Sequence, residues 1–122
     1  MHPGQSVVHR FVLEPMDNIK KIFVTYRQRG RFILEKVVTS LSTEDDETYV
    51  EIYLDQFETL KFQDGKDAWV QLNILFEKDG IEYRAVSNPI DISVGVQFCR
   101  KTIGDYERAS TLDDFFILAD ED

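Results

Sequence analysis

With 122 residues, the chain is long enough to bury one hydrophobic core, and we expect a single globular domain rather than a disordered chain. Its hydrophobic content of 43% and aromatic content of 12% favour β structure with a packed interior. The formal net charge of −9 argues against binding to a phosphate backbone, which requires a basic stripe. The sequence has neither a long apolar run nor a signal-peptide pattern, so we expect no membrane-spanning helix.

The negative charge is unevenly placed. Residues 1–104 hold 16 acidic and 13 basic residues, whereas residues 105–122 hold seven acidic residues and one basic residue. We therefore predict a β-sandwich domain over residues 1–104, followed by an acidic C-terminal arm over residues 105–122. Cys99 is the single cysteine, which excludes an intramolecular disulfide and fits folding in a reducing compartment.

Side chains that alternate between apolar and polar indicate β-strands in the first third of the chain. We expect strands over residues 6–13, 21–27 and 31–38, with Gly30 supplying the positive φ of a hairpin turn between the second and third. Residues 39–47 are polar and acidic, and we expect them to form an exposed loop.

The clearest strand pattern lies between residues 48 and 76. The residues expected to face inward are Val50, Ile52, Leu54, Ala68, Val70, Leu72, Ile74 and Phe76. Between the two strands, Asp55 is expected to cap a single helical turn. We expect Phe57, Leu60 and Phe62 to fold under the sheet edge after this cap.

The chain then returns through a hairpin. Asp79-Gly80 is a strong turn signal, and residues 81–86 form the next expected strand. Pro89 predicts either a bulge or a change of sheet before a last strand over residues 90–94. About seven short strands favour an antiparallel β-sandwich, with an open barrel as the alternative.

No residue pattern predicts catalysis, a cofactor or a metal site. The acidic run from Glu44 to Glu47 lacks the spaced ligands of a calcium loop, so we expect it to be solvated. His2 and His9 belong to no catalytic motif, and we expect His9 to have a structural role. Cys99 lies at a strand end, where we expect it to be packed.

Two groups of apolar residues are candidates for partner binding. Trp69 and Tyr53, together with Tyr49, lie on strand faces opposite the aliphatic set, where they form an exposed aromatic patch or are covered by other parts of the chain. The second group is the predicted helix of the arm, and its candidates are Leu112, Phe115, Phe116, Ile117 and Leu118. The arm docks on the chain's own sandwich or on a neighbouring subunit, and we favour the neighbour.

Part of the chain resembles a family of phage proteins. The resemblance rests on the corner LDQFETLKF at residues 54–62, followed by VQLN at 70–73, the Asp79-Gly80 turn and RAVS at 84–87. This order is similar to that of small proteins of tailed bacteriophages, in which an L-T-x-E-E-T-L-x-F corner precedes a V-Q-V-N strand, a D-G turn and an R-x-A-S segment. Phe57 replaces the usual acidic residue, and no functional residue carries over.

The resemblance covers roughly residues 6–95 and extends to the immunoglobulin-like N-terminal modules of phage baseplate upper proteins. It implies an immunoglobulin-like β-sandwich with a structural place in the virion and no enzyme activity. Residues 105–122 lie outside it.

These observations lead to two hypotheses. The first is a virion protein of the capsid, neck or tail, made in the host cytoplasm, which binds other virion subunits or copies of itself in a symmetric array. The second is an acidic inhibitor that occupies a basic groove of a host nucleic-acid-binding protein, and it rests on the net charge of −9. No motif supports an enzyme.

Overall fold

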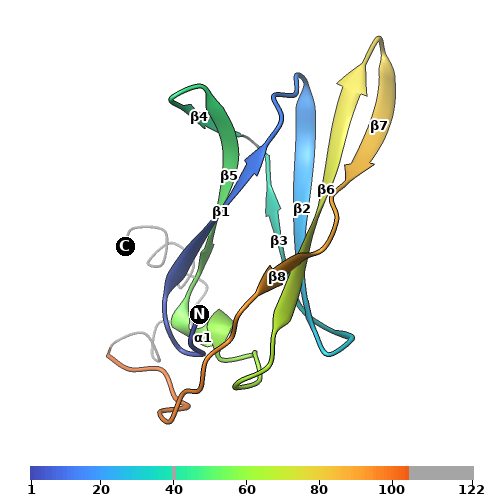
Figure 1. The fold of residues 1–122 in the computed structure, drawn as a ribbon. Coiled ribbons are helices and arrows are strands. Elements are labelled where there is room, and N and C mark those ends of the chain that lie inside the picture. The colour runs from blue at the N-terminus through green and yellow to red at the C-terminus, as the bar shows by residue number, and fades with distance from the viewer. Residues whose placement is uncertain (40, 105–122) are drawn as a thin grey trace.

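The computed structural model describes residues 1–39 and 41–104, which fold into an all-β sandwich of two antiparallel sheets (Figure 1). The three-stranded sheet has the order β1 (Val7–Leu13), β5 (Glu47–Leu54), β4 (Ser42–Glu44). The other sheet has the order β3 (Arg31–Val38), β2 (Ile19–Gln28), β6 (Ala68–Lys78), β7 (Ile81–Val86), and β8 (Ile90–Ile92) also pairs with β6. The predicted antiparallel sandwich is confirmed, and no helix in the described part of the chain is long and apolar enough to span a membrane.

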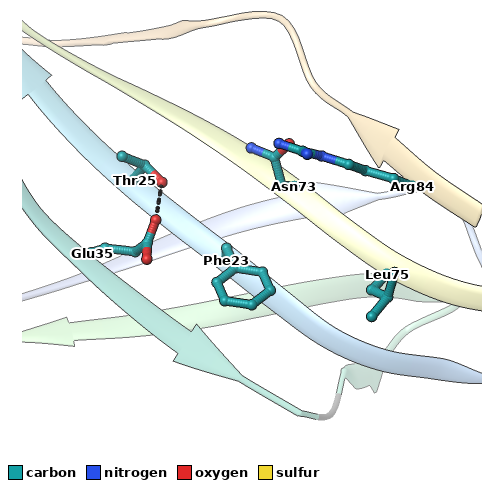
Figure 2. Close-up of a pocket in the computed structure, with 6 residues that line it drawn as sticks. All are labelled: Phe23, Thr25, Glu35, Asn73, Leu75 and Arg84. Carbon is teal, nitrogen blue, oxygen red and sulfur yellow. Dashed lines mark hydrogen bonds between the residues drawn. The ribbon is translucent and has the colours of Figure 1, made fainter.

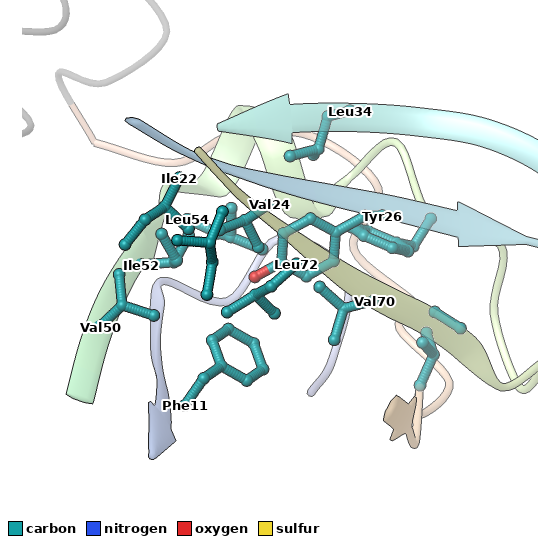
Figure 3. Close-up of a cluster of buried hydrophobic side chains, with 14 residues drawn as sticks. Phe11, Ile22, Val24, Tyr26, Leu34, Val50, Ile52, Leu54, Val70 and Leu72 are labelled. Carbon is teal, nitrogen blue, oxygen red and sulfur yellow. The ribbon is translucent and has the colours of Figure 1, made fainter. Parts of the chain in front are cut away.

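The core is the layer of side chains that the two sheets bury between them (Figure 3). Every second residue of β2, β5 and β6 points into this layer, as the alternation in the sequence predicts. The fully or almost fully buried members from these strands are Ile22, Val24, Tyr26, Val50, Ile52, Leu54, Ala68, Val70, Leu72 and Ile74. Because each large apolar side chain buried in this way contributes about 1.5–3 kcal/mol, this layer dominates the stability of the sandwich.

The corner between the sheets is the short helix α1 (Gln56–Thr59), which begins at the predicted cap, Asp55. The backbone N–H of Glu58 donates to Asp55 Oδ1 at 2.8 Å, and the backbone N–H of Asp55 donates to Glu58 Oε1 at 3.0 Å. This reciprocal pair is a capping box, which satisfies two backbone donors at the start of a helix. Phe62 is fully buried after the corner, as predicted, but the prediction for Phe57 is wrong because its side chain is exposed.

One strand, β4, was not expected from the sequence. Residues 42–44, expected within a loop, form β4 and pair with β5 through a turn in which Asp45 and Asp46 both have positive φ, 51° and 67°. Two consecutive residues with positive φ are typical of a tight two-residue hairpin turn, which acidic residues tolerate better than most. The turn is exposed, as expected for the acidic run.

Pro89 does not mark a change of sheet, because β7 and β8 lie along the same edge of β6. The chain between them is held to β6 by Ser87. Its backbone N–H donates to the carbonyl of Leu72, and its hydroxyl accepts from the Leu72 N–H, both at 2.9 Å. A side-chain hydroxyl therefore replaces a missing backbone acceptor where the two strand segments are interrupted.

Two side chains fix the loops at the end of the sandwich near α1. The buried amide of Gln28 donates to the carbonyls of Gln63 and Lys66, both at 2.8 Å, and accepts from the Gln63 N–H at 2.6 Å. Arg100 donates to Asp64 Oδ1 at 2.5 Å and to the carbonyls of Leu60 and Phe62 at 3.1 Å. The loop between α1 and β6 is thus tied to β2 and to the segment that follows β8.

We predict that Asp55→Ala lowers the free energy of unfolding by about 1–2 kcal/mol, because it removes the buried acceptor of the capping box. Asp55→Asn keeps an acceptor at the same position and should retain most of that stability. Chemical denaturation of the three proteins measures the difference. Equal loss in both variants would contradict the role given to the cap.

Candidate protein-binding site

The outer face of the five-stranded sheet carries large apolar side chains that are exposed to solvent. Residues that are neighbours across β2, β3 and β6 share a face, so the register places Phe23 beside Val37 and Asn73, and Arg27 beside Phe32 and Trp69. Phe32 is 62% exposed, and Trp69 is 45% exposed. A solvated sheet face is usually polar, so large apolar side chains on this one need an explanation.

A depression of about 390 Å³ lies on this face, with side chains from four strands around it (Figure 2). Thr25 on β2 donates its hydroxyl hydrogen to Glu35 Oε1 on β3 at 2.7 Å. Arg84 on β7 donates through Nε to Asn73 Oδ1 on β6 at 2.8 Å. The side chains of Phe23 and Leu75 also line the depression. Its lining therefore combines apolar side chains with two pairs of polar side chains that are fixed by hydrogen bonds to each other.

A second depression of about 450 Å³ meets the first at Thr25. It runs over Arg27, Trp69 and Gln71 to Gly30 in the β2–β3 turn and to Pro89 before β8. We call the two depressions together the outer-face groove. Its floor is formed by the two central strands, β2 and β6. Because each of them is paired with neighbours on both sides, they provide a rigid base for the groove.

A β-bulge places Phe32 on this face. The pairing of β2 with β3 shifts by one residue after Tyr26, so Arg27 is opposite Phe32 instead of Ile33. Without the extra residue, Phe32 would share the inward face with Leu34, because side chains alternate along a strand. A bulge commonly turns a side chain in this way next to a functional surface.

The structure separates the aromatic residues that the sequence grouped together. Trp69 is exposed on the five-stranded sheet, whereas Tyr53 is half-buried on β5, in the other sheet. Tyr49 is buried, and the Arg10 guanidinium lies over its ring, 4.0 Å from the centroid. Of the two alternatives that the sequence left open, a single exposed patch is excluded because Trp69 and Tyr53 lie in different sheets. The arm candidates Leu112, Phe115, Phe116, Ile117 and Leu118 lie outside the described residues.

His9 packs against the core. Its Nδ1 lies 2.9 Å from the Tyr26 hydroxyl, and the two share a hydrogen bond. Burial lowers the pKa of His9, and the positive charge of the chain's N-terminus lowers it further. Burial raises the pKa of Tyr26, and the Glu58 carboxylate adds to the effect. A neutral histidine held by a buried tyrosine fits the structural role that we expected.

The Glu58 carboxylate is engaged by the fold. Burial raises its pKa, although Lys36 Nζ lies 2.5 Å from Oε2 and the Asp55 N–H donates to Oε1. Every polar atom of this carboxylate that faces the interior is thus satisfied by a structural partner.

The remaining candidates are a metal site and Cys99. Among residues 1–39 and 41–104, no group of three or more His, Cys, Asp or Glu side chains is placed to hold a metal ion. Cys99 is exposed, so the prediction that it is packed is wrong. Its backbone N–H donates to Gln97 Oε1 at 3.1 Å in an irregular segment after β8.

A scan against models of protein families finds no match for this chain, and a search of curated proteins finds no relative.

The lowered pKa of His9 makes stability depend on pH. Because the folded protein binds the His9 proton more weakly than the unfolded chain does, this contribution is present above the ordinary histidine pKa of about 6.5 and is lost as pH falls through that range. We expect His9→Gln, which keeps a polar partner for Tyr26, to lose less stability than the parent between about pH 7 and pH 5.5. Urea unfolding at several pH values measures both slopes. Identical slopes would show that His9 titrates alike in the folded and unfolded chains.

Proposed function

We propose that the protein is a non-enzymatic structural component of a tailed-phage virion that acts through contacts with other protein subunits. The observation that carries the proposal is the outer-face groove, where Trp69 is exposed beside fixed polar groups. The exposed Phe32 lies opposite Arg27, which lines the groove. Aromatic side chains and arginine are the residues enriched in protein interfaces, and Arg27 and Arg84 supply the arginine.

The resemblance of residues 54–62 and 70–87 to small phage proteins supports the virion setting. In the structure, these residues form the corner at α1, the inner strand β6 and the hairpin to β7. They build the scaffold on which the groove lies.

We further propose that the sandwich is of the immunoglobulin-like kind. If β1, β5 and β4 correspond to strands B, E and D of that fold, then β3, β2, β6 and β7 correspond to C′, C, F and G. This assignment gives both sheets the strand order of an immunoglobulin sandwich that lacks strand A. The corner at α1 is then the connection between strands E and F.

The charges around the groove favour a specific orientation of the partner. Glu35 lies on one side of the first depression and Arg84 on the other, and Arg27 lies in the second. Paired charges of both signs contribute more to register and selectivity than to affinity, while the apolar side chains between them contribute most of the binding energy. A partner with an apolar segment flanked by one acidic and one basic group fits this surface.

A virion offers a reason for such a modest surface to suffice. In a symmetric particle the same contact is repeated in every subunit, so a weak individual interface gains strength through avidity. We propose that the partners are other virion subunits or copies of this chain, with no cofactor, nucleic acid or membrane involved. Synthesis takes place in the host cytoplasm, before assembly.

We expect the double variant Phe32→Ser/Trp69→Ser to reduce incorporation into particles by roughly tenfold or more, because loss of interface hot-spot residues costs at least ~1–2 kcal/mol. The two side chains are 62% and 45% exposed and lie outside the core, so the thermal unfolding midpoint should change little. Quantitative mass spectrometry of particles purified after complementation measures the effect.

The matched control is Val8→Ser/Val12→Ser. These two valines are each 56% exposed on the outer face of the three-stranded sheet, and their replacement should leave incorporation unchanged. Absence of the unmodified protein from purified particles would overturn the proposed function, and equal effects of the two double variants would reject the groove as the contact.

A further inference from the structure

The five-stranded sheet is wider than the three-stranded sheet that covers its inner face. The inner side chains of β2 and β6 are buried, and so is Leu34 of β3. The register pairs Ala85 of β7 with the core residue Ile74, so Ala85, Tyr83 and Ile81 share this inner side. Nevertheless, Ile81 is 56% exposed and Tyr83 is 43% exposed. The three-stranded sheet therefore covers β3, β2 and β6 but leaves the inner face of β7 open.

The strand of the smaller sheet that borders this open face is β1. Only residues 39–41 join β3 to β4, so β4 lies on the β3 side and β1 forms the opposite edge, toward β7. In the described part of the chain, β1 pairs with no strand other than β5. Its seven residues contain neither a proline nor a bulge, which are two common means of protecting an edge strand. One side of the β1 backbone is thus available for pairing.

The residues before β1 close this side of the sandwich only at the end near α1. There the ammonium group of Met1 donates to the Ser93 carbonyl at 3.0 Å, and the Gly95 N–H donates to the Met1 carbonyl at 2.7 Å. Among residues 1–39 and 41–104, no backbone pairing continues from this bridge toward the β6–β7 hairpin. The hairpin extends past the other strands (Figure 1).

The unpaired edge of β1 and the open face of β7 border the same space, which we call the strand slot. One added strand completes both surfaces, because paired strands lie about 4.8 Å apart and stacked sheets about 10 Å apart. Three strands then become four, matching β3, β2, β6 and β7 below them. In the immunoglobulin-like assignment proposed above, this is the position of strand A.

A second copy does not fit the strand slot through its own β1. Such a pair would join the two small sheets across a two-fold axis, with each β1 lying above the partner's β7. Because β6 and β7 are neighbours in the larger sheet, β7 of each copy would then coincide with β6 of the other. The slot is wide enough for a single strand only.

We propose that the strand slot binds one extended segment of another polypeptide chain. The backbone of the segment pairs with β1, and its alternate apolar side chains pack on Ile81 and on the stacked rings of Phe76 and Tyr83, whose centroids are 5.6 Å apart. Lys78 follows Phe76 on the same face and is exposed, so an acidic residue fits the end of the segment near the β6–β7 turn. The inference goes beyond the proposed function and does not require it.

Amide hydrogen exchange of the full-length protein, followed by NMR, tests the slot. The probe is a short synthetic peptide in which valine and threonine alternate between two terminal glutamates. Successive N–H groups of a strand point to opposite sides, so the peptide should protect every second amide of β1. We expect exchange at these amides to slow roughly tenfold with the peptide at about ten times its Kd. Apolar contact with β7 alone would not produce this alternation.

Two matched comparisons make the test specific. A peptide of the same composition with its valines grouped together should not slow exchange, because its apolar side chains no longer share one face. Ile81→Asp should weaken binding of the alternating peptide roughly tenfold, because it places a charge on the inner face of β7. Val86→Asp makes the same kind of change on the outer face of the same strand, where Val86 is 54% exposed, and should leave binding unchanged.

The inference is wrong if exchange at β1 does not slow, if it slows at β3 or β7 instead, or if the two peptides or the two variants behave alike. Protection of alternate β1 amides before the peptide is added would also overturn it. In that case the slot is filled by the same chain in a monomer or by a second copy in a dimer, and sedimentation velocity distinguishes the two. No measurement here uses particles, so failure of this inference is distinguishable from failure of the proposed function.

Discussion

The two sheets are joined by a single layer of side chains that both of them bury. Val50, Ile52 and Leu54 of β5 enter this layer from one sheet, and alternate residues of β2 and β6 enter it from the other. Tyr26 shows how strictly the layer is filled, because its ring is fully buried against Phe62 and its hydroxyl is paired with His9. The chain can pass between the sheets at α1 only because the capping box satisfies the backbone there.

This constraint also determines the outer surface. When every second residue of β2 and β6 is directed inward, the residues between them must face outward, and Phe23 and Trp69 are among these. The bulge after Tyr26 adds Phe32 to the same side. Because β2 and β6 are central strands with their backbone groups paired on both sides, the groove rests on the part of the sheet least able to deform.

The sequence predicted what depends on local pattern. The alternation at Val50, Ile52 and Leu54, the cap at Asp55 and the Asp79-Gly80 turn each depend on a few neighbouring residues, and all three are present. The loop expected over residues 39–47 contains β4 because Asp45 and Asp46 both adopt the left-handed conformation, which acidic composition alone does not reveal.

The candidate site was harder to predict because it depends on contacts between distant residues. A period of two shows that Trp69 and Tyr53 avoid the core, but it does not show that they belong to different sheets. That assignment comes from the pairing of β1 with β5 and of β2 with β6, which join residues far apart in the sequence. An uninterrupted period of two along β3 would direct Phe32 inward with Leu34, and only the bulge opposite Tyr26 and Arg27 turns it outward.

The β2–β3 turn lies between two depressions of the surface. Arg27 and Gly30 line the outer-face groove, while Arg29 and Arg31 line a depression of about 320 Å³ at the end of the sandwich. Arg29 and Gly30 have φ values of 54° and 75°, so the backbone reverses within two residues, and Arg27 is directed to one surface while Arg29 and Arg31 are directed to another. The Arg27 guanidinium donates to the Gly30 carbonyl and holds the turn closed.

The same antiparallel arrangement places the β4–β5 turn and the β2–β3 turn at opposite ends of the sandwich (Figure 1). Strand ends alternate between two ends of the molecule, so the Asp45-Asp46 turn lies opposite the β2–β3 turn with its arginines.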